Sequence, residues 1–452
     1  MVGIKSKNRR VITKKGAIAL IIIFCVTAVL GLFIGKNVIG VYSNKYWYFV
    51  IFLLVDFLLL GTFIKTFKFF IRKQFWLITI YFLPLFFIYL VAIISSIKPI
   101  EDWNSFFRIY FPGVMMILII SKLSLLSFML LGEIISIVVN FFGRIFNKKS
   151  QIFSKTYKIF TIMGAISAML IITLVIISCF KWTYDFKIHE INYYDEEIPD
   201  SFNDFKIVHL SDIHFGSWYK AELFQKAVDK INSLKPDLVV FTGDLVNEKA
   251  SEAYPFEDMM KQIKAEHGVY SVLGNHDYDY YNNGKTDTTL SQSELLADFY
   301  KRVNWKLLNN SNAILRKQND SIALLGVENW SRIERWGKYG DVELANKGTE
   351  KVPFKILLSH DPDHWQNVIT KKHKDVNLTL SGHTHAMQMG FEKGKIRFSP
   401  AQFMFEQWAG LYSTNNDNNK QSLYVNRGLG TVAFPFRLGI ASEITLITLK
   451  SN

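Results

Sequence analysis

Residues 205–214 read FKIVHLSDIH, an apolar run that leads directly into a carboxylate and an imidazole. The run predicts a short buried β-strand, because β-branched and aromatic residues dominate it. Asp212 and His214 follow its end and are separated by one residue. Since alternate residues of an extended chain point to the same side, we expect both side chains to reach one metal ion.

Four further apolar runs lead into metal-type ligands in the same way. They are Leu238–Phe241 before Thr242-Gly243-Asp244, Val269–Leu273 before Gly274-Asn275-His276-Asp277, Phe354–Ser359 before His360, and Asn377–Leu380 before Ser381-Gly382-His383-Thr384-His385. Open α/β sheets bind ligands at the carboxyl edges of their strands. We therefore expect the five segments to meet at one edge, where the glycines allow tight turns and leave room beside the backbone.

These strands predict an α/β domain over residues 186–452. Further runs predict strands at Ile322–Val327, Leu423–Asn426 and Ile444–Leu449, and helical patterns lie near Ala221–Leu234, Glu257–Ala265 and Leu290–Arg302. Segments 281–290, 335–352 and 413–421 are rich in Gly, Asn, Asp or Lys and predict loops.

Residues 1–185 predict an all-α transmembrane region. A bilayer is spanned by about 20 apolar residues, and four stretches meet this condition: Gly16–Ile34, Tyr46–Ile64, Trp76–Ile97 and Ile159–Phe180. A fifth stretch, Phe111–Phe142, is interrupted by Lys122 and Glu133. It fits either one over-long helix or a re-entrant piece followed by a span. We count it as one crossing, which makes about five in all.

Charge predicts the orientation of these spans. Residues 1–182 contain 21 Lys and Arg but four acids, and the basic residues gather in the N-terminal segment and in the second and fourth loops. Because positive loops stay in the cytoplasm, five crossings place residues 186–452 outside it. Two crossings by Phe111–Phe142 would reverse this result. The basic excess thus belongs to membrane topology, so we expect no nucleic-acid partner despite a pI near 9.3.

Two features of the spans bear on their role. The first span is longer than the apolar core of a signal peptide and no small-residue cleavage site follows it, so we expect an uncleaved anchor. Asp56, Lys122 and Glu133 are costly at membrane depth. They predict either a polar pathway or a structural role, namely pairing inside the helix bundle or snorkelling of the side chains.

The available donor groups narrow the choice of metal. All ten histidines lie after residue 188, and both cysteines fall inside apolar spans. The candidate ligands are therefore carboxylate, amide and imidazole groups without a thiolate. This donor set predicts Mn, Fe or Zn in a reactive centre rather than a structural zinc site.

The blocks D-x-H, G-D, G-N-H-D, a single His and G-H-x-H occur here in that order over roughly residues 205–385. In this the chain resembles the calcineurin-like metallophosphoesterase superfamily. The strings LSDIH, FTGDLV, LGNHDY, LSHDP, SGHTH and NRGLG look like its branch of transmembrane proteins with a metallophosphoesterase domain, over about residues 188–450. That branch includes bacterial members similar to UDP-2,3-diacylglucosamine pyrophosphatases. The family pattern has Gly where this chain has Ala386.

The resemblance implies a four-layer αββα sandwich that holds two divalent metal ions. It also implies how the ligands are shared between the ions. The first ion takes Asp212, His214 and His385, the second takes Asn275, His360 and His383, and Asp244 bridges both.

The resemblance also places residues with catalytic roles beside the metals. His276 is expected to protonate the leaving oxygen or stabilise the transition state, and Asp277 to hold its imidazole. Arg427, in Asn426-Arg427-Gly428, predicts either a bidentate grip on a substrate phosphate or a structural ion pair.

The predicted function is hydrolysis of a phosphodiester or pyrophosphate by a membrane-anchored enzyme, on a lipid-linked or envelope substrate. Two alternatives stay open. One is the UDP-2,3-diacylglucosamine pyrophosphatase reaction of lipid A synthesis, which conflicts with the orientation because that substrate is expected on the cytoplasmic face. The other is a non-catalytic, metal-binding membrane sensor.

Overall fold

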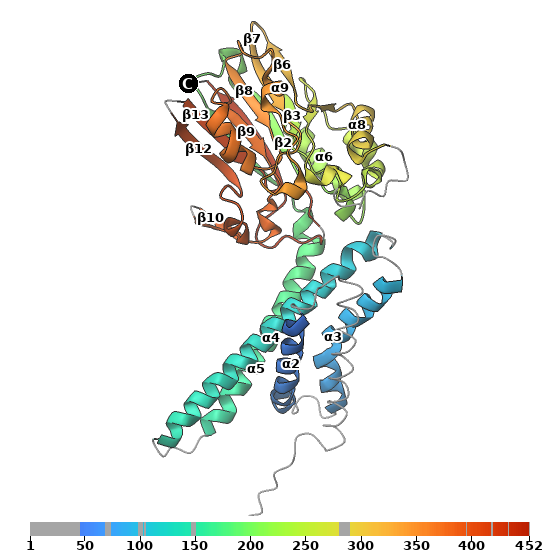
Figure 1. Ribbon diagram of the computed structural model, residues 1–452, viewed down its shortest axis with the longest axis vertical. Coiled ribbons are helices and arrows are strands. Elements are labelled where there is room, and N and C mark those ends of the chain that lie inside the picture. Colours follow the sequence, from blue (N-terminus) through green and yellow to red (C-terminus); the bar gives the residue numbers. More distant parts are fainter. Residues whose placement is uncertain are drawn as a thin grey trace, which may run out of the picture. The chain divides into compact units, whose positions relative to one another are not determined.

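A computed structural model describes residues 46–67, 74–97, 103, 105–145, 151–279, 290–394, 396–416, 419–432 and 434–451. The chain divides into two compact units, residues 1–174 and 175–452. Figure 1 shows the helices of the first unit and the sheets of the second. The division falls before the boundary at 185 that the sequence predicts, because the last turns of a long helix pack with the second unit.

Four described helices correspond to four of the five predicted spans. They are α2 (Tyr46–Phe67), α3 (Gln74–Ile97), α4 (Ser105–Ile145) and α5 (Gln151–Phe180). The predicted span Gly16–Ile34 lies outside the described residues. Among those that are described, the segments Ile109–Gly143 and Thr156–Tyr184 are long and apolar enough to cross a membrane, judged by length and composition.

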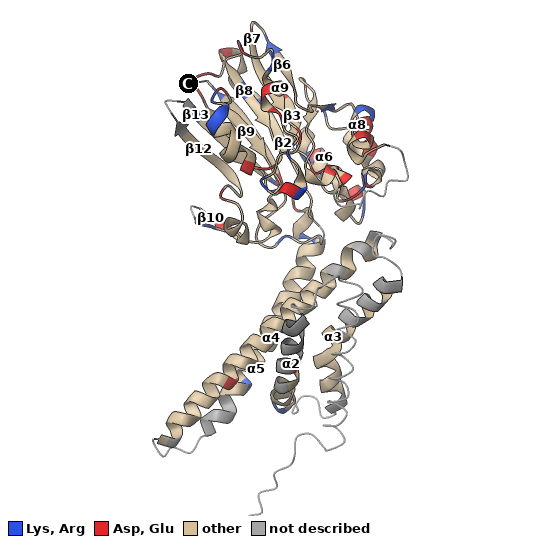
Figure 2. Ribbon diagram, in the orientation of Figure 1, with Lys and Arg blue, Asp and Glu red and all other residues tan. Residues whose placement is uncertain are grey.

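The long stretch Phe111–Phe142 forms part of one continuous helix, α4, of 41 residues. At a rise of 1.5 Å per residue it is about 60 Å long, roughly twice the thickness of the hydrocarbon core. A re-entrant piece would need a break in the helix, and α4 has none. Figure 2 shows that the described parts of α4 and α5 are almost free of charged residues, whereas the second unit carries both signs.

The charged residues of the predicted spans are paired inside the helix bundle, which is one of the interpretations given above. Lys122 Nζ lies 3.0 Å from Asp56 Oδ1 and donates a hydrogen bond of 2.7 Å to the carbonyl oxygen of Tyr81. Glu133 accepts a hydrogen bond from the hydroxyl of Thr62. The charge of Asp56 is therefore matched by a cation on a neighbouring helix.

The second unit contains two six-stranded mixed sheets. The first has the order β1 (Lys187–Tyr194), β14 (Glu443–Lys450), β2 (Lys206–Leu210), β3 (Leu238–Phe241), β4 (Val269–Ser271) and β5 (Lys306–Leu307). The second has the order β12 (Gly410–Asn416), β13 (Asn419–Val425), β9 (Leu378–Ser381), β8 (Phe354–Leu358), β7 (Asp320–Gly326) and β6 (Ser311–Lys317).

The alternation of side chains along the strands builds the layers. On β8, Phe354, Ile356 and Leu358 point into a core shared by both sheets, and Leu357 points to the opposite face. The outer face of the first sheet is covered by α6 (Glu222–Ser233), α7 (Glu257–Met260) and α8 (Gln292–Arg302). The outer face of the second is covered by α9 (Val342–Asn346) and by the helical segment Trp365–Ile369 that leads into α10 (Thr370–Lys372). The predicted four-layer αββα sandwich is confirmed.

All eight predicted strands are present, and the structure adds β1, β5, β6 and β12, which were not predicted. The loop expected at 335–352 contains the short helix α9. Segment 413–421 was expected to be a loop, but most of it belongs to the antiparallel pair of β12 and β13. Backbone hydrogen bonds between the two strands hold this edge pair together. Its side chains are polar, so the sequence lacks the apolar pattern from which a strand is predicted. The helix expected at Glu257–Ala265 ends at Met260. Residues 281–289 of a predicted loop lie outside the described residues.

The topology brings the chemistry-bearing strands together. In the first sheet β2, β3 and β4 are parallel neighbours, and in the second β8 and β9 are parallel neighbours. Each of the five is followed by one of the candidate ligand segments. Parallel neighbours end at the same sheet edge, so the fold delivers all five segments to one end of the sandwich.

We expect Lys122→Met to destabilise the helical unit, because it leaves the buried Asp56 carboxylate without its cation. Breaking such a pair costs about 3–5 kcal/mol, whereas replacing both partners by apolar residues is close to neutral. Thermal unfolding of the full-length protein in detergent should show a large loss for the single variant and recovery in Asp56→Leu/Lys122→Met. A double variant as unstable as the single one would contradict the pairing.

Candidate metal centre

Two groups of three side chains form at this end of the sandwich. Within each group, one ligand atom per residue lies within 4.8 Å of the others. The first group is Asp212, His214 and His385, and the second is Asp244, His360 and His383. The structure thus brings together six of the seven predicted ligands, and the seventh, Asn275, lies against the second group.

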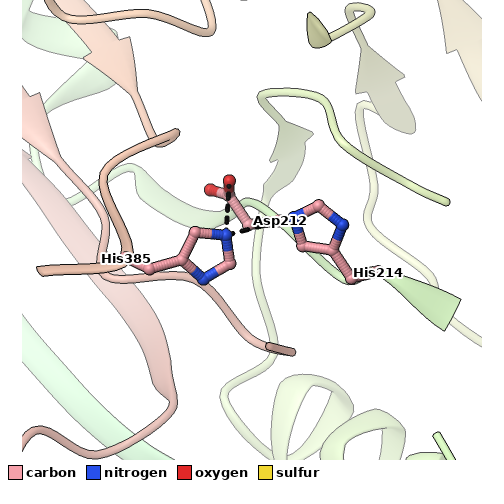
Figure 3. A group of neighbouring side chains, drawn as sticks. All are labelled: Asp212, His214 and His385. Atoms are coloured by element: carbon pink, nitrogen blue, oxygen red, sulfur yellow. Dashed lines mark hydrogen bonds and ion pairs between the residues drawn. The ribbon is translucent and has the colours of Figure 1, made fainter. Parts of the chain in front are cut away.

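The first group has the geometry of ligands that share one ion. Figure 3 shows the Asp212 carboxylate and the two imidazoles turned toward a common point. His385 Nε2 lies 3.1 Å from His214 Nε2 and 3.1 Å from Asp212 Oδ1. Ligands bonded at about 2.1 Å to one ion, at angles near 90–110°, lie about 3.0–3.4 Å apart. The donor set and its spacing therefore fit a divalent cation.

The second group is equally close. His360 Nε2 lies 3.2 Å from Asp244 Oδ2, from Asn275 Oδ1 and from His383 Nδ1. The same oxygen of Asp244 lies 3.6 Å from His214 Nε2 in the first group. Asp244 consequently lies between the two groups and faces both.

The segment after β3 orients three imidazoles through its carbonyl oxygens. His360 Nδ1 lies 2.8 Å from the carbonyl oxygen of Thr242, and His214 Nδ1 lies 3.1 Å from that of Val246. A carbonyl accepts only from a protonated Nδ1, so each ring turns Nε2 toward the centre. The carbonyl oxygen of Asn247 lies 2.8 Å from His276 Nδ1 in the same way.

The backbone at the ligands is strained, which corrects one expectation. Asp212 and His214 were expected to share a side of a pleated strand, but β2 ends at Leu210 and their φ angles are +54° and +48°. Asp244, His383 and His385 also have positive φ, between +50° and +70°. The left-handed region is unfavourable for such residues and occurs mostly where function requires it.

The glycines of the site admit contacts that a side chain would block. A Cβ at Gly382 would lie 1.9 Å from Ser211 Oγ and 2.1 Å from Asp212 Oδ2. A Cβ at Gly274 would lie 2.3 Å from Asp244 Oδ1. The backbone N–H of His383 then donates to the Asp212 carboxylate at 3.0 Å, which joins the two sheets at the centre.

Asp277 was expected to hold the imidazole of His276, but its hydrogen-bond partners in the structure are backbone groups. Its carboxylate accepts hydrogen bonds from the backbone N–H groups of Gly274, Asp244 and Leu245, at 2.8–2.9 Å. The partner of His276 Nδ1 is instead the Asn247 carbonyl. Asp277 therefore ties the loop after β4 to the loop after β3. Burial, helped by the Asp244 carboxylate, raises the pKa of Asp277 to about 7.

Charges at the centre depend strongly on one another because nearly all of these groups are buried. Burial alone would lower the pKa of His360, but the Asp244 carboxylate outweighs it and raises the pKa to about 10. Burial would raise the pKa of Asp212, but the imidazole of His385 lowers it. A proton on His360 therefore helps to balance the Asp244 carboxylate, a role that a bound cation would take over.

Arg427 lies in a network of ion pairs. One terminal nitrogen of its guanidinium lies 2.6 Å from Glu443 Oε2, and the other lies 2.6 Å from Glu392 Oε1. Burial would raise the pKa of Glu443, but Arg427 lowers it to about 2. Arg427 therefore forms the structural ion pair that was one of its two predicted roles. Its binding of a substrate phosphate stays a prediction.

Three residues with a role at the site were not found from the sequence. Arg437 is fully buried, and its guanidinium donates to the carbonyl oxygens of Arg427, Gly428 and Gly430. The loop that it braces bonds to Ser211 and Asp212 through Leu429 and Gly430. Asp361 Oδ2 lies 3.9 Å from His383 Nε2. Asp361 could have been predicted, because it is an acidic residue directly after the ligand His360.

The ring of Phe405 lies 5.5 Å from the ring of His383 and forms an apolar wall of the site. Phe405 is 20 residues further along the chain than the last ligand, His385. It lies in the aromatic-rich stretch Phe403–Tyr412, which is a signal for core packing or for an apolar surface, but no short-range pattern links it to the ligands.

Fold and centre together define a metal-dependent phosphoesterase, and comparisons with known proteins agree. Residues 205–387 match the family described as calcineurin-like phosphoesterase. A Danio rerio protein named "Transmembrane protein with metallophosphoesterase domain" is 31% identical over 344 residues, covering 73% of this chain and 74% of its own. The chain belongs to the calcineurin-like phosphoesterase family and is a phosphoester hydrolase.

Bacterial relatives match a smaller share of the chain. An uncharacterised Bacillus subtilis metallophosphoesterase, YkuE, is 30% identical and covers 56% of this chain and 82% of its own. A Campylobacter jejuni one, Cj0846, is 28% identical and covers 59% and 64%. The Danio rerio match covers more of this chain than residues 186–452 contain, so it extends into the helical part. Together with the two long apolar helices, this supports membrane association.

We expect Gly382→Ala to disrupt the first metal group, because the added methyl collides with Ser211 and with the Asp212 carboxylate. Elemental analysis of the purified protein should then show a loss of bound metal. Ala386→Gly is the matched control, since Ala386 has a φ of +48° that glycine adopts without strain. The control should keep its metal and gain at most about 1 kcal/mol of stability. Full metal content in Gly382→Ala would contradict the assignment.

Proposed function

We propose that this chain holds two divalent ions in a shared centre and hydrolyses a phosphodiester or pyrophosphate. Asp212, His214 and His385 hold one ion. Asn275, His360 and His383 hold the other. The observation that carries this proposal is the position of Asp244, whose Oδ2 faces ligand nitrogens of both groups at 3.6 and 3.2 Å.

Mn, Fe or Zn suits this donor set of imidazole nitrogens and carboxylate and amide oxygens. When bound, a pair of such ions polarises the phosphoryl group and generates the nucleophile at neutral pH. The chain supplies the rest. Its ligand loops fix the position of the phosphoryl group, and Asp277 fixes two of those loops against each other.

His276 is the proposed proton donor to the leaving oxygen. Its ring lies 4.9 Å from the ring of His214, so it borders the first group. The Asn247 carbonyl accepts from Nδ1, so in this proposal Nε2 carries the transferred proton. His276 is also partly exposed, unlike Asp212, His214 and Asn275, as access to a substrate requires.

We further propose that the substrate is lipid-linked or belongs to the cell envelope, because the hydrolase unit is continuous with a long apolar helix. In this proposal five spans place the unit outside the cytoplasm. The unbroken α4 supports a single crossing by that helix. The UDP-2,3-diacylglucosamine reaction would need the opposite orientation. A phosphate grip by Arg427 would require the substrate to replace the Glu392 carboxylate.

His276→Ala should keep both metals and lose activity in a way that depends on the leaving group. An alkyl leaving group needs the proton, so its release should slow by about 10²–10⁴-fold. Nitrophenolate needs it less, so bis-p-nitrophenyl phosphate with Mn²⁺ should show a smaller loss. Equal losses for both substrates would exclude a proton-donor role. Asp244→Asn is the contrasting variant, which should lose metal occupancy as well as activity.

The orientation is tested by reporters fused after Asn452 in the full-length chain. We expect alkaline phosphatase to be active there and green fluorescent protein to be dark, since the first folds outside the cytoplasm and the second within it. The reverse pattern would place the site in the cytoplasm and favour a nucleotide-linked substrate.

A further inference from the structure

A small hairpin next to the metal centre is built unlike the rest of the hydrolase unit. Strands β10 (Phe391–Lys393) and β11 (Ile396–Phe398) form a separate two-stranded sheet, which Figure 1 shows apart from the two large sheets. Isolated two-stranded hairpins are marginal in water. This one nevertheless directs apolar side chains outward.

Exposed apolar side chains gather on the hairpin and just after it, and we call this set the apolar platform: Phe391, Ile396, Phe398, Phe403 and Met404. Phe403 is 78% exposed and Ile396 is 66% exposed. The ring of Phe398 lies 5.9 Å from that of Phe391 and 6.5 Å from that of Phe403. Exposed apolar groups that gather in this way mark a surface that contacts a membrane or another molecule.

The base of the hairpin is fastened to the end of a candidate membrane span. Gly390 N–H donates to the Leu438 carbonyl oxygen at 2.9 Å. The preceding residue, Arg437, exchanges two hydrogen bonds with Ser178, of 2.6 and 2.7 Å. Ser178 lies in the last turn of α5, within the apolar segment Thr156–Tyr184 and within the same compact unit as the hairpin. The platform is therefore tied to the place where the chain leaves that segment.

Charged residues around the platform suit a lipid surface. Lys393 is exposed on β10 and Lys181 is exposed just after α5, whereas the guanidinium of Arg397 donates a hydrogen bond of 2.9 Å to the carbonyl oxygen of Ala409. Aromatic residues interleaved with Lys and Arg are typical of the interface between a bilayer and water, where the rings meet the acyl boundary and the cations meet anionic headgroups.

The platform also adjoins the metal centre. Ser399, directly after β11, donates a hydrogen bond of 2.6 Å to the carbonyl oxygen of Ala386, the residue after the ligand His385. Phe405 lies two residues beyond Phe403, and its ring lies 5.5 Å from that of His383. The platform is therefore joined to the loop that carries the ligand His385.

We propose that the apolar platform inserts into the lipid surface and holds the metal centre at the membrane interface. The site then meets phosphoesters whose apolar tails remain in the same bilayer. This second step rests on the proposed lipid-linked substrate, whereas the insertion itself does not. The occupant of the platform is the bilayer and not a second copy of the chain.

Insertion is tested with the full-length protein in phosphatidylcholine–phosphatidylglycerol vesicles. A Cys25→Ser/Cys179→Ser background receives Phe403→Cys, labelled with an environment-sensitive fluorophore, and lipids that carry a nitroxide on the acyl chain are added. We expect strong quenching. Leu344→Cys is the matched control, because Leu344 is 44% exposed and α9 packs on β6 and β7, at the far edge of the second sheet from β12. Its label should remain unquenched.

Equal, weak quenching at both positions would overturn the proposal. A label at position 403 that is shielded without quenching, in particles with twice the mass of one chain, would assign the platform to a second copy and would overturn it as well.

The link to the substrate is tested with two nitrophenyl phosphodiesters. Hexadecyl p-nitrophenyl phosphate is embedded in the vesicles, and bis-p-nitrophenyl phosphate is soluble. In Ile396→Ser/Phe403→Ser the ratio of turnover on the embedded to that on the soluble substrate should fall about tenfold, whereas Leu344→Ser should leave the ratio unchanged. An unchanged ratio in the platform variant would overturn the role in access. If the native protein cleaves neither diester, the proposed function fails, while quenching still decides insertion.

Discussion

The structure depends on one constraint, namely that buried carboxylates and imidazoles must converge without leaving their charges unmatched. The segment after β3 meets this constraint. It places Asp244 between the two ligand groups, and its carbonyl oxygens set the rings of His214, His360 and His276. A ring held in this way keeps a fixed orientation, with Nε2 directed toward the centre. The centre is thus assembled before a cation arrives, and cations then relieve the crowding of like groups.

The surrounding fold maintains this arrangement at some cost. Positive φ angles at five ligands would relax in an isolated loop. Here they are held by contacts from both sheets, such as the bond from the backbone of His383 to the Asp212 carboxylate. The buried guanidinium of Arg437 gathers the carbonyl oxygens of a third loop behind Asp212. Burial lowers the pKa of Arg437 to about 10. A guanidinium carries five N–H donors, so it can bond to several carbonyl oxygens at once, which the ammonium group of a lysine would do less well.

The metal ligands could be predicted from the sequence more fully than the residues that hold those ligands in place. Strands and ligands were recognisable because each apolar run ended in a residue type with metal chemistry, and this is a local pattern. The left-handed backbone at Asp212 was not predictable, because it results from contacts between distant loops. The same holds for Asp277, whose partners are backbone groups of the loop after β3 and not its neighbour His276. Strand β12 was not predicted, because it is held by backbone hydrogen bonds to β13 and lacks the apolar side chains that indicate a strand.

The hydrogen bonds of Ser178 and Thr183 to the segment 435–437, and of Ser442 to Thr183, have an architectural consequence. Residues at the end of α5 complete the packing of a loop whose other side supports a ligand segment. The final turn of α5 is therefore a component of the globular unit that begins at Val175. Removing this turn would disturb the loop that supports the ligand segment at Asp212.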